Sequence, residues 1–270
     1  MLSYRHEYHA GNHADVLKHL CQIIVLDYMM EKDKPITYID THSGQGQYKL
    51  TGKRATQTKE YQGGIGRIAA ASHPLLERYA SFFSHEWYSG SVNIAQSILR
   101  PTDRLRCYEI HSSDFERLVD NTRHDRRVKC FETDGFKGLI AQVPPPDKRA
   151  AIMIDPSYEI KSDYHQVIQT LTGALKRFAT GVYMVWYPLL EGPEVTHFYR
   201  KLTHLKNAEQ KIKSLDIQLT VRHRSQEMYG SGMFIINPPW TLERQLKSVL
   251  PLLKEQLGDE TASFHVIPRD

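Results

Sequence analysis

The sequence predicts an α/β fold with a doubly wound, mostly parallel sheet, and three observations indicate it. Apolar segments rich in β-branched residues alternate with segments of helical periodicity along most of the 270 residues. Several apolar segments end in a carboxylate followed by a turn, at the place where open α/β sheets bind ligands. Near the C-terminus two strand segments follow each other without a helix between them. This order predicts a mixed sheet of seven strands with a late antiparallel element.

The composition is that of a globular protein with a mildly basic charge. The net charge of +4 and a pI close to 8.8 permit a polyanionic partner without requiring one. The three cysteines are widely spaced and form no CxxC pair, so we expect neither a disulfide framework nor a zinc site. The N-terminus is too polar for a signal sequence, and no apolar run approaches the ~18 residues of a membrane span. We therefore expect a cytoplasmic protein with no membrane association.

The N-terminal segment is polar and aromatic, and a helix is expected to follow it. Asn12 is a good N-cap, Asp15 falls in the first turn, and apolar residues at helical spacing continue to about residue 31. His9 and His13 stand four residues apart, which is a possible metal-binding spacing. No third ligand stands at a suitable distance, so no metal site is expected.

The first strand, 36–40, ends at Asp40 and leads into a loop that contains Gly44 and Gly46. Glycines let a backbone approach a nucleotide closely, but the loop lacks the full GxGxxG pattern of dinucleotide-binding proteins. An ordinary strand-to-helix turn explains it equally well. Residues 47–88 then interrupt the alternation, and their spacing predicts a small helical insertion with a basic start. We expect one domain over residues 1–270 that carries this insertion as a subdomain.

The following strands bring further carboxylates to strand ends. The segment 105–109 ends in Glu109, where an acid commonly accepts both hydroxyls of a ribose. The segment 128–133 leads to Asp134-Gly135, which is either an ordinary turn or a contact for an adenine ring. The other expected strands lie at 150–154, 182–188, 215–221 and 232–236. Helices are expected at 92–99, with Ser91 as the candidate cap, at 191–213 and at 242–257.

Four strand-end carboxylates in succession, Asp40, Glu109, Asp134 and Asp155, predict a line of acids along one rim of the sheet. Core packing does not require such a line, because acids are rarely buried without a reason. It suits a ligand with a ribose, an adenine and a positive centre, and S-adenosylmethionine has all three. The pyrophosphate of a dinucleotide would instead be repelled.

The turn Asp155-Pro156-Ser157-Tyr158 follows a buried apolar strand and has the groups needed to hold a planar amine. The carboxylate and the proline carbonyl would accept its two N–H bonds, and the aromatic ring would stack on its face. A nucleobase amino group has that shape. Asn237-Pro238-Pro239-Trp240 offers a similar set, but it follows the last expected strand, away from the strands assigned to the cofactor. We interpret it as a structural turn, and leave open a place in the pocket wall.

The chain resembles the RlmJ family of bacterial 23S ribosomal RNA adenine-N6 methyltransferases over nearly its whole length. The N-terminal run is long and unusual, which makes the resemblance specific. Ser157 departs from the family motif, which has a second proline there, and should loosen the turn slightly. The matching segments are Ser3-Tyr4-Arg5-His6, the run from His9 to His19, Asp40-Thr41-His42, Gly90-Ser91, Asp134-Gly135-Phe136, Asp155-Pro156 with Tyr158, and Gly232-Met233-Phe234.

The resemblance implies a Rossmann-like class I fold that uses S-adenosylmethionine to methylate N6 of a specific adenine in 23S ribosomal RNA. The substrate would be protein-free or early-assembly RNA, and the enzyme a monomer. Catalysis is then expected from Asp155, Pro156 and Tyr158. Substrate contact is expected from Tyr4, with His6 and Lys18 close by. The implied cofactor contacts are His19, His42, Ser91, Glu109, Asp134, Gly135 and Asp155.

Two other functions remain open at this point. A DNA adenine-N6 methyltransferase shares all of this chemistry, because the motif does not read the 2′-hydroxyl. A nonenzymatic RNA-binding protein on a nucleotide-binding fold would bind RNA without being stabilised by S-adenosylmethionine. A third hypothesis, a nicotinamide-dependent oxidoreductase, has less support because the dinucleotide-binding fingerprint is missing. The basic stretches 49–67 and 200–224 are candidates for RNA contact, although solvated helix faces explain them almost as well.

Overall fold

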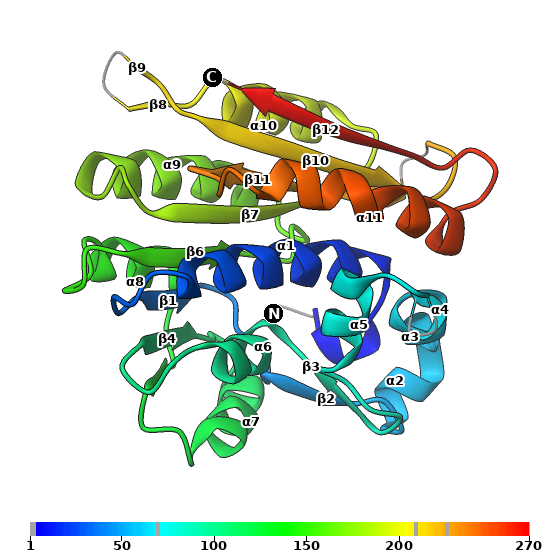
Figure 1. Cartoon of the computed structure of the whole chain (residues 1–270), viewed down its shortest axis with the longest axis horizontal. Coiled ribbons are helices and arrows are strands. Elements are labelled where there is room, and N and C mark those ends of the chain that lie inside the picture. The colour runs from blue at the N-terminus through cyan, green and yellow to red at the C-terminus, as the bar shows by residue number, and fades with distance from the viewer. Residues whose placement is uncertain (1–3, 69–70, 208–209, 225–226, 270) are drawn as a thin grey trace.

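The computed structural model describes residues 4–68, 71–207, 210–224 and 227–269, and it confirms the α/β class. Figure 1 shows the strands of one central sheet stacked across the molecule, with helices in front of and behind them. Within the described residues, eight strands form this sheet, in the spatial order β12 (Ser263–Arg269), β10 (Ser214–Thr220), β11 (Gly230–Ile236), β7 (Val182–Leu189), β6 (Ala150–Ile154), β1 (Thr37–Asp40), β4 (Arg104–Tyr108) and β5 (Val128–Phe131).

The chain winds outward from β1 in both directions. It runs from β1 to β4 and β5 on one side, and then returns to β6 and β7 on the other, and neighbouring strands in this part are parallel. The strands β11, β10 and β12 extend the β7 side with antiparallel pairing. The order reverses between β1 and β6, and the carboxyl ends at such a switch point form a crevice in which ligands bind.

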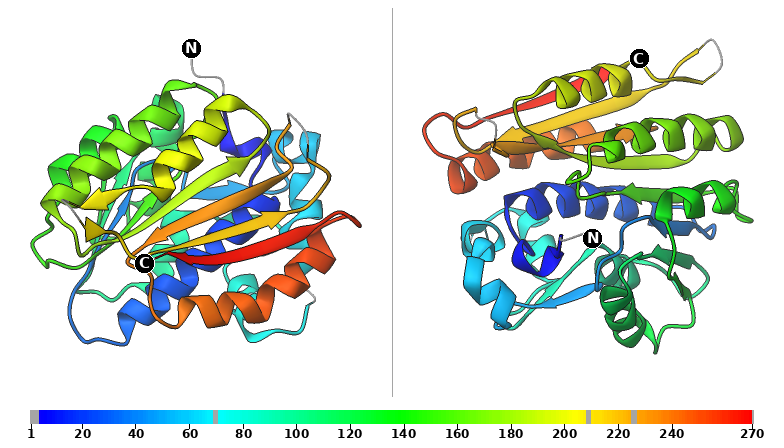
Figure 2. Two further views of the ribbon diagram at one scale, coloured as in Figure 1. Left: turned by 90° about the horizontal axis from the view of Figure 1, so that it is seen from above. Right: turned by 180° about the vertical axis from the view of Figure 1, so that it is seen from behind.

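Two layers of helices cover the sheet, because alternate strand residues point to opposite faces. On β1, Tyr38 belongs to the core of one face and Ile39 to the core of the other. Figure 2 shows the two layers on either side of the strands. One face carries α1 (His13–Met30), α6 (Ser91–Ile98) and α11 (Leu242–Leu257), and the other carries α8 (Gly135–Gln142), α9 (Ser162–Arg177) and α10 (Pro193–Thr203).

Residues 47–88, expected to form a helical insertion, follow β1 and precede α6. The first and last residues of this segment pair as two short antiparallel strands, 47–49 with 87–89, and its helix α4 packs on α11. Residues 69–70 lie outside the described part of the chain. The helices lie beside the N-terminal 3₁₀ turn η1 (His6–Tyr8), in cyan and blue in Figure 1. The elements are β2 (Gln47–Lys49), α2 (Lys53–Thr58), α3 (Glu60–Gly63), α4 (Ile65–Ile68), α5 (Pro74–Ala80) and β3 (Trp87–Ser89).

The eighth strand, β12, was not predicted. None of its residues is fully buried, so it lacks the continuous apolar run that marks the predicted strands. Among the described strands β12 pairs only with β10, so it is an edge strand, where Pro268 is tolerated. The prediction of seven strands was therefore one too few.

Two helix predictions also need correction. The helix expected at 191–213 ends at Thr203, because its apolar stripe of Val195, Phe198 and Leu202 does not continue. The short strands β8 (Lys206–Asn207) and β9 (Gln210–Lys211) follow it. Ser91 does not cap α6, because its hydroxyl donates to Asp40 instead.

The bulk features of the described residues can be stated briefly. No helix among them is both long and apolar enough to cross a lipid bilayer. Cys21 and Cys107 are buried, Cys130 is half-buried, and all three are free thiols.

Candidate functional site

A cavity of about 580 Å³ opens at the carboxyl ends of the parallel strands. Its wall combines the N-terminal segment, the start of α1, and the loops that follow β1, β4, β5 and β6. Residues far apart in the sequence therefore meet there. The structure brings together in this wall all the catalytic, cofactor and substrate residues that the family resemblance implied: Tyr4, His6, Lys18, His19, His42, Ser91, Glu109, Asp134, Gly135, Asp155, Pro156 and Tyr158. Ser3 of the N-terminal motif lies outside the described residues.

One member of the predicted line of acids does not reach the cavity. Asp40 is fully buried, and its carboxylate accepts hydrogen bonds from the Tyr38 and Ser91 hydroxyls at 2.9 and 2.6 Å. The backbone N–H of His42 donates to it as well. Asp40 thus holds the loop after β1 in place, and the expectation that it faces a ligand was wrong. The other three acids of the line do face the cavity.

Asp155 ends β6 and is paired across the cavity wall with Lys18 of α1. The Lys18 ammonium donates to Oδ2 of Asp155 at 2.6 Å, and the Asp155 side chain remains 17 % exposed. Burial raises the pKa of Asp155, although Lys18 and His6 oppose the increase. Burial alone would lower the pKa of Lys18, but Asp15 and Asp155 outweigh it and raise that pKa. Lys18 is therefore charged, and it donates to one of the two oxygens of Asp155.

The turn after Asp155 is held in one conformation by Tyr158. This residue has a left-handed backbone, with φ at 56°, which is uncommon outside glycine. Its hydroxyl donates to the Trp186 carbonyl at 2.8 Å, and its ring packs against Tyr164 and Phe198. Ser157 accepts a long hydrogen bond of 3.4 Å from the N–H of Glu159. The ring of Tyr158 is thus a fixed part of the cavity wall and is only 8 % exposed.

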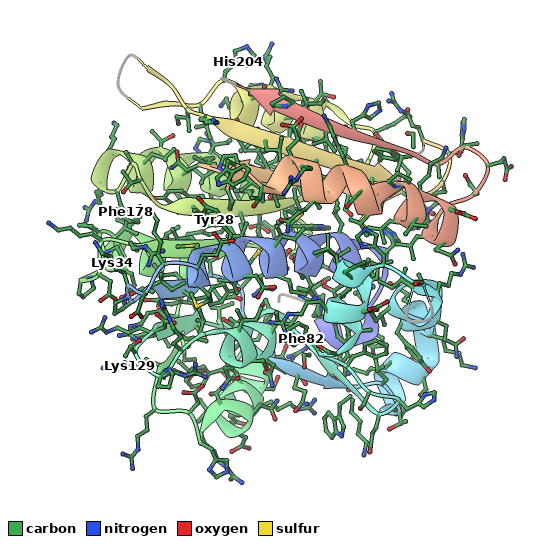
Figure 3. The ribbon with its side chains drawn as sticks, viewed as in Figure 1. Tyr28, Lys34, Phe82, Lys129, Phe178 and His204 are labelled. Carbon is green, nitrogen blue, oxygen red and sulfur yellow. The ribbon has the colours of Figure 1, made fainter. Side chains whose placement is uncertain are left out.

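The look-alike turn Asn237-Pro238-Pro239-Trp240 lies at the opposite end of the sheet. The Asn237 amide donates to the carbonyls of Ala179 and Gly181, both at 2.7 Å, and these residues precede β7. Figure 3 shows Lys34 and Phe178, which precede β1 and β7, together at that amino-terminal end. Trp240 is 74 % exposed there. The turn is structural, as predicted, and it takes no part in the cavity wall.

Glu109 ends β4 and is held by the backbone. Its carboxylate accepts hydrogen bonds from the N–H groups of Gly44, at 2.9 Å, and His111, at 2.7 Å. Burial raises the pKa of Glu109 to about 7, although these hydrogen bonds oppose the increase. The charge of this acid therefore changes near neutral pH.

The two histidines predicted to contact the cofactor are neutral. Burial lowers the pKa of both His19 and His42 to about 3. His19 Nδ1 lies 2.6 Å from the Tyr88 hydroxyl, whereas its Nε2 is buried and has no hydrogen-bond partner in the described part of the chain. The His42 ring packs edge-on against Phe136, with 4.9 Å between the ring centroids. Both rings are thus fixed by their neighbours.

Asp134 and Gly135 form the start of α8. Asp134 caps the helix by accepting the N–H of Phe136 at 2.8 Å. A Cβ atom on Gly135 would overlap the Thr41 carbonyl oxygen, so only glycine lets α8 approach the loop after β1 this closely. The requirement for glycine here is one of space.

Replacing Gly135 with alanine should therefore destabilise the protein by about 1–3 kcal/mol, because an added methyl group must displace backbone atoms. Urea denaturation of the purified variant measures this loss. Gly63→Ala is the matched control, since a Cβ atom there meets nothing within 4 Å. Equal stability of the two variants would show that α8 moves away from the loop without cost.

The sequence did not identify Asp15 as part of the site. It was assigned to the first turn of a helix, yet its side chain is only 1 % exposed and contacts both His6 and Lys18. The spacing of Asp15 and Lys18, three positions apart on one helix, was the available signal, but an i,i+3 pair is common on helix surfaces and did not indicate burial. Among the described residues, no group of three or more potential ligands is arranged to hold a metal ion.

Comparisons with known proteins connect this geometry to a family. The sequence model of the family described as "Ribosomal RNA large subunit methyltransferase D, RlmJ" matches residues 33–267. The chain belongs to the RlmJ family. It is 42 % identical to ribosomal RNA large subunit methyltransferase J of Escherichia coli, over 98 % of this chain and 99 % of that protein. The corresponding Haemophilus influenzae protein is 39 % identical, over 98 % of both chains.

A solved structure agrees with this RlmJ-family assignment. The crystal structure of protein LPL1258 from Legionella pneumophila superposes with a TM-score of 0.88, at 35 % identity, and covers 96 % of this chain and 98 % of that one. The resemblance drawn from the N-terminal run and the strand-end motifs is thus confirmed. The same findings support a methyltransferase over the nonenzymatic alternative.

Proposed function

We propose that this RlmJ-family protein transfers the methyl group of S-adenosylmethionine to the exocyclic N6 of an adenine in 23S ribosomal RNA. The observation that carries the proposal is the Asp155-Pro156 turn at the carboxyl end of β6. It lies in the cavity that also exposes Glu109 and Asp134, with Lys18 on one oxygen of its carboxylate. The names of the two bacterial relatives favour ribosomal RNA over DNA as the substrate.

The residues present fit S-adenosylmethionine. The buried Nε2 of His19 has no hydrogen-bond partner among the described residues and belongs to a residue of the cavity wall, so a ligand group can bind it. Glu109 would accept the ribose hydroxyls, and Asp134 with Gly135 would contact the adenine. His42 and Ser91 complete the same part of the wall. Bound S-adenosylmethionine supplies an electrophilic methyl group.

Asp155 and the Pro156 carbonyl orient the amine that attacks. The N6 lone pair of adenine is delocalised into the ring, which makes the amine a poor nucleophile. Two acceptors that bind its hydrogens localise the lone pair and direct it, so that orientation and electrostatics supply most of the effect. Because Lys18 holds Oδ2, the other oxygen of Asp155 is the one that accepts an N6 hydrogen. The carboxylate then takes the proton as it becomes acidic.

Tyr158 contributes an aromatic wall to the base pocket. Enzymes that modify a base take it out of its helix, and stacking on an aromatic ring stabilises the extruded base by about 1–3 kcal/mol. The packing of Tyr158 against Tyr164 and Phe198 fixes the plane against which the adenine would lie. Tyr4, His6 and Lys18 border the same cavity and would contact the substrate from the N-terminal side.

The role of Glu109 predicts that cofactor binding depends on pH. Ribose hydroxyls donate to an ionised carboxylate, but burial raises the pKa of Glu109 to about 7, so it must lose a proton on binding below that pH. The affinity for S-adenosylmethionine should be about tenfold lower at pH 6 than at pH 8, as measured by calorimetry. Glu109→Gln should bind more weakly with little pH dependence, whereas Glu116→Gln, on the exposed surface of α7 (Ser112–Thr122), should retain the wild-type profile. A pH-independent wild-type affinity would contradict this role.

The RNA is proposed to reach the cavity past the N-terminal segment. The exposed side chains of Lys53 and Lys59 belong to α2 and its C-terminal end, and α2 packs beside the N-terminal segment. Arg222 and Arg224 are exposed in the chain that follows β10. Arg222 is close enough to His13 to lower its pKa, after the larger effect of burial. Basic side chains in such positions would bind phosphates.

We further propose that the protein acts as a cytoplasmic monomer on protein-free or early-assembly RNA, and that residues 47–88 form a subdomain of a single methyltransferase domain.

Methyl transfer from labelled S-adenosylmethionine to three substrates tests this function. Deproteinised 23S ribosomal RNA should accept label rapidly, intact large subunits slowly, and duplex DNA not at all. Preferential labelling of DNA would overturn the proposal in favour of a DNA methyltransferase. Binding of RNA without any transfer, and without thermal stabilisation by S-adenosylmethionine, would overturn it in favour of a nonenzymatic protein.

A further inference from the structure

Asp15 lies at a junction of three segments of the site. Oδ2 of its carboxylate accepts a hydrogen bond from the Gly11 N–H at 2.8 Å and lies 2.9 Å from Nε2 of His6. Oδ1 lies 2.7 Å from the ammonium of Lys18. Through Lys18, the carboxylate is linked to the Asp155 turn. One buried acid thus joins the N-terminal segment, the first turn of α1 and the end of β6.

These contacts form a continuous series that we call the Tyr4–Asp155 chain. Its members are Tyr4, His6, Asp15, Lys18 and Asp155. The Tyr4 hydroxyl lies 2.8 Å from Nδ1 of His6, and Nε2 of the same ring lies 2.9 Å from Oδ2 of Asp15, so the His6 ring connects Tyr4 to Asp15. Lys18 bridges the two carboxylates, at 2.7 Å from Asp15 and 2.6 Å from Asp155. The position of Lys18 therefore depends on both acids.

Helix capping alone does not account for Asp15. Its contact with the Gly11 N–H is the kind that an acid in a first turn makes to the preceding backbone. The side chain of Asn12 already caps α1, by accepting the N–H groups of Ala14 and Asp15. A cap also needs only one oxygen near the helix end, whereas the second oxygen of Asp15 forms an ion pair with Lys18 and the side chain is almost fully buried. Burying a carboxylate is unfavourable unless its partners compensate, and here they do so within the cavity wall.

We propose, on the basis of the function proposed above, that Asp15 is a positioning residue of the methyl-transfer site. It ties the N-terminal segment to Lys18, and it holds the ammonium of Lys18 against one oxygen of Asp155. The other oxygen of Asp155 is thereby directed at the substrate amine while Tyr4 and His6 cover the cavity. Asp15 itself touches no reacting atom, and acts through His6 and Lys18.

The first test measures anchoring and does not depend on methyl transfer. Asp15→Asn keeps the size of the side chain but loses its charge. Hydrogen exchange in a peptide that covers residues 5–12 should be about tenfold faster in this variant than in the wild type. Other ion pairs also hold the segment, including Arg54 with Glu7, but they are partly exposed and are weakened by about 0.5 M salt. The control is Asp27→Asn, on a half-exposed acid of the same helix that is paired with Arg78. Unchanged protection in Asp15→Asn at this salt concentration would overturn the proposal.

The second test measures the consequence for transfer. Asp15→Asn should lower kcat for methyl transfer to 23S ribosomal RNA by about 100-fold, because a small misplacement of the acceptor is costly, while the affinity for S-adenosylmethionine changes by less than about threefold. A double-mutant cycle with His6→Ala separates positioning from structure. If Asp15 and His6 act through the Tyr4–Asp155 chain of contacts, kcat of the double variant should be little lower than kcat of the worse single variant. Thermal unfolding of each variant excludes a loss of activity through loss of fold.

The outcomes distinguish this proposal from the proposed function. Wild-type kcat in Asp15→Asn, or losses that multiply in the cycle, would overturn the role of Asp15 while leaving the function intact. If the wild-type protein transferred no methyl group to any RNA, the proposed function would fail. The exchange measurement would then still decide whether Asp15 anchors the N-terminal segment.

Discussion

Replacing Asp155 with asparagine should lower the rate of methyl transfer by about 10³-fold, because the variant loses both a charged acceptor and the group that takes the proton. The fold should persist, since asparagine retains an oxygen for Lys18 and Lys18 retains its ion pair with Asp15. Affinity for S-adenosylmethionine should fall by no more than about tenfold, the effect of one hydrogen bond to a charged group. Initial rates with labelled cofactor and RNA, together with calorimetry, measure the two effects separately.

The look-alike turn provides the matched control for Asp155. Asn237→Gly removes the amide that binds two carbonyls, and glycine tolerates the left-handed backbone of φ 53° found there. This variant should lose about 1–3 kcal/mol of stability but keep its rate of transfer. An Asp155→Asn protein that turns over at the wild-type rate, or an inactive but folded Asn237→Gly protein, would show that the wrong turn has been assigned.

Replacing Lys18 with methionine should have the largest effect on stability. It leaves the buried carboxylates of Asp15 and Asp155 without their shared cation, and the loss of one partner from a buried ion pair costs about 3–5 kcal/mol. Without Lys18 the pKa of each carboxyl group rises above its value in the unfolded chain. The folded protein then loses stability as the pH increases through the raised pKa, because each buried group must ionise. The deficit measured by urea denaturation should therefore be larger at pH 8 than at pH 5.

An exposed ion pair provides the comparison for Lys18. Lys247→Met disrupts the pair with Glu243 on the surface of α11, and should cost no more than about 0.5 kcal/mol at either pH. A loss in Lys18→Met that is equally small, or that does not change with pH, would show that the two acids are not held as a charged group by Lys18.

The parts of the fold that the sequence predicted are those with strong local signals. The strand at 150–154 is a run of apolar residues followed by an acid and a proline. This pattern predicted the position of the strand and also that its carboxyl end faces the ligand site. Asn12 could be identified as a cap because the capping interaction is local, and its hydrogen bonds confirm it. Strand β12 was missed because none of its residues is fully buried, and such a strand can be recognised only if it is known to lie at an edge. That information belongs to the whole sheet.

The parts of the site that the sequence did not reveal depend on long-range contacts. Lys18 and Asp155 are separated by 137 positions, and nothing local to either residue indicates the other. The role of Lys18 was inferred from the family resemblance alone. Asp15 was interpreted as an ordinary first-turn acid; its own partners lie within nine positions of it, and only the distant pairing of Lys18 with Asp155 brings it into the site. Asp40 was the opposite case. This strand-end acid was expected to face a ligand, but its carboxylate accepts hydrogen bonds from Tyr38 and Ser91 inside the protein.

The atom that receives the methyl group tests the central claim most directly. 23S ribosomal RNA transcribed in vitro would be incubated with the protein and S-adenosylmethionine, digested to nucleosides and analysed by mass spectrometry. We expect N6-methyladenosine as the product of the wild-type protein and none from Asp155→Asn. Methylation at a carbon, at a ribose hydroxyl or on another base would contradict the assignment of the Asp155-Pro156-Ser157-Tyr158 turn as the site that holds an adenine amine.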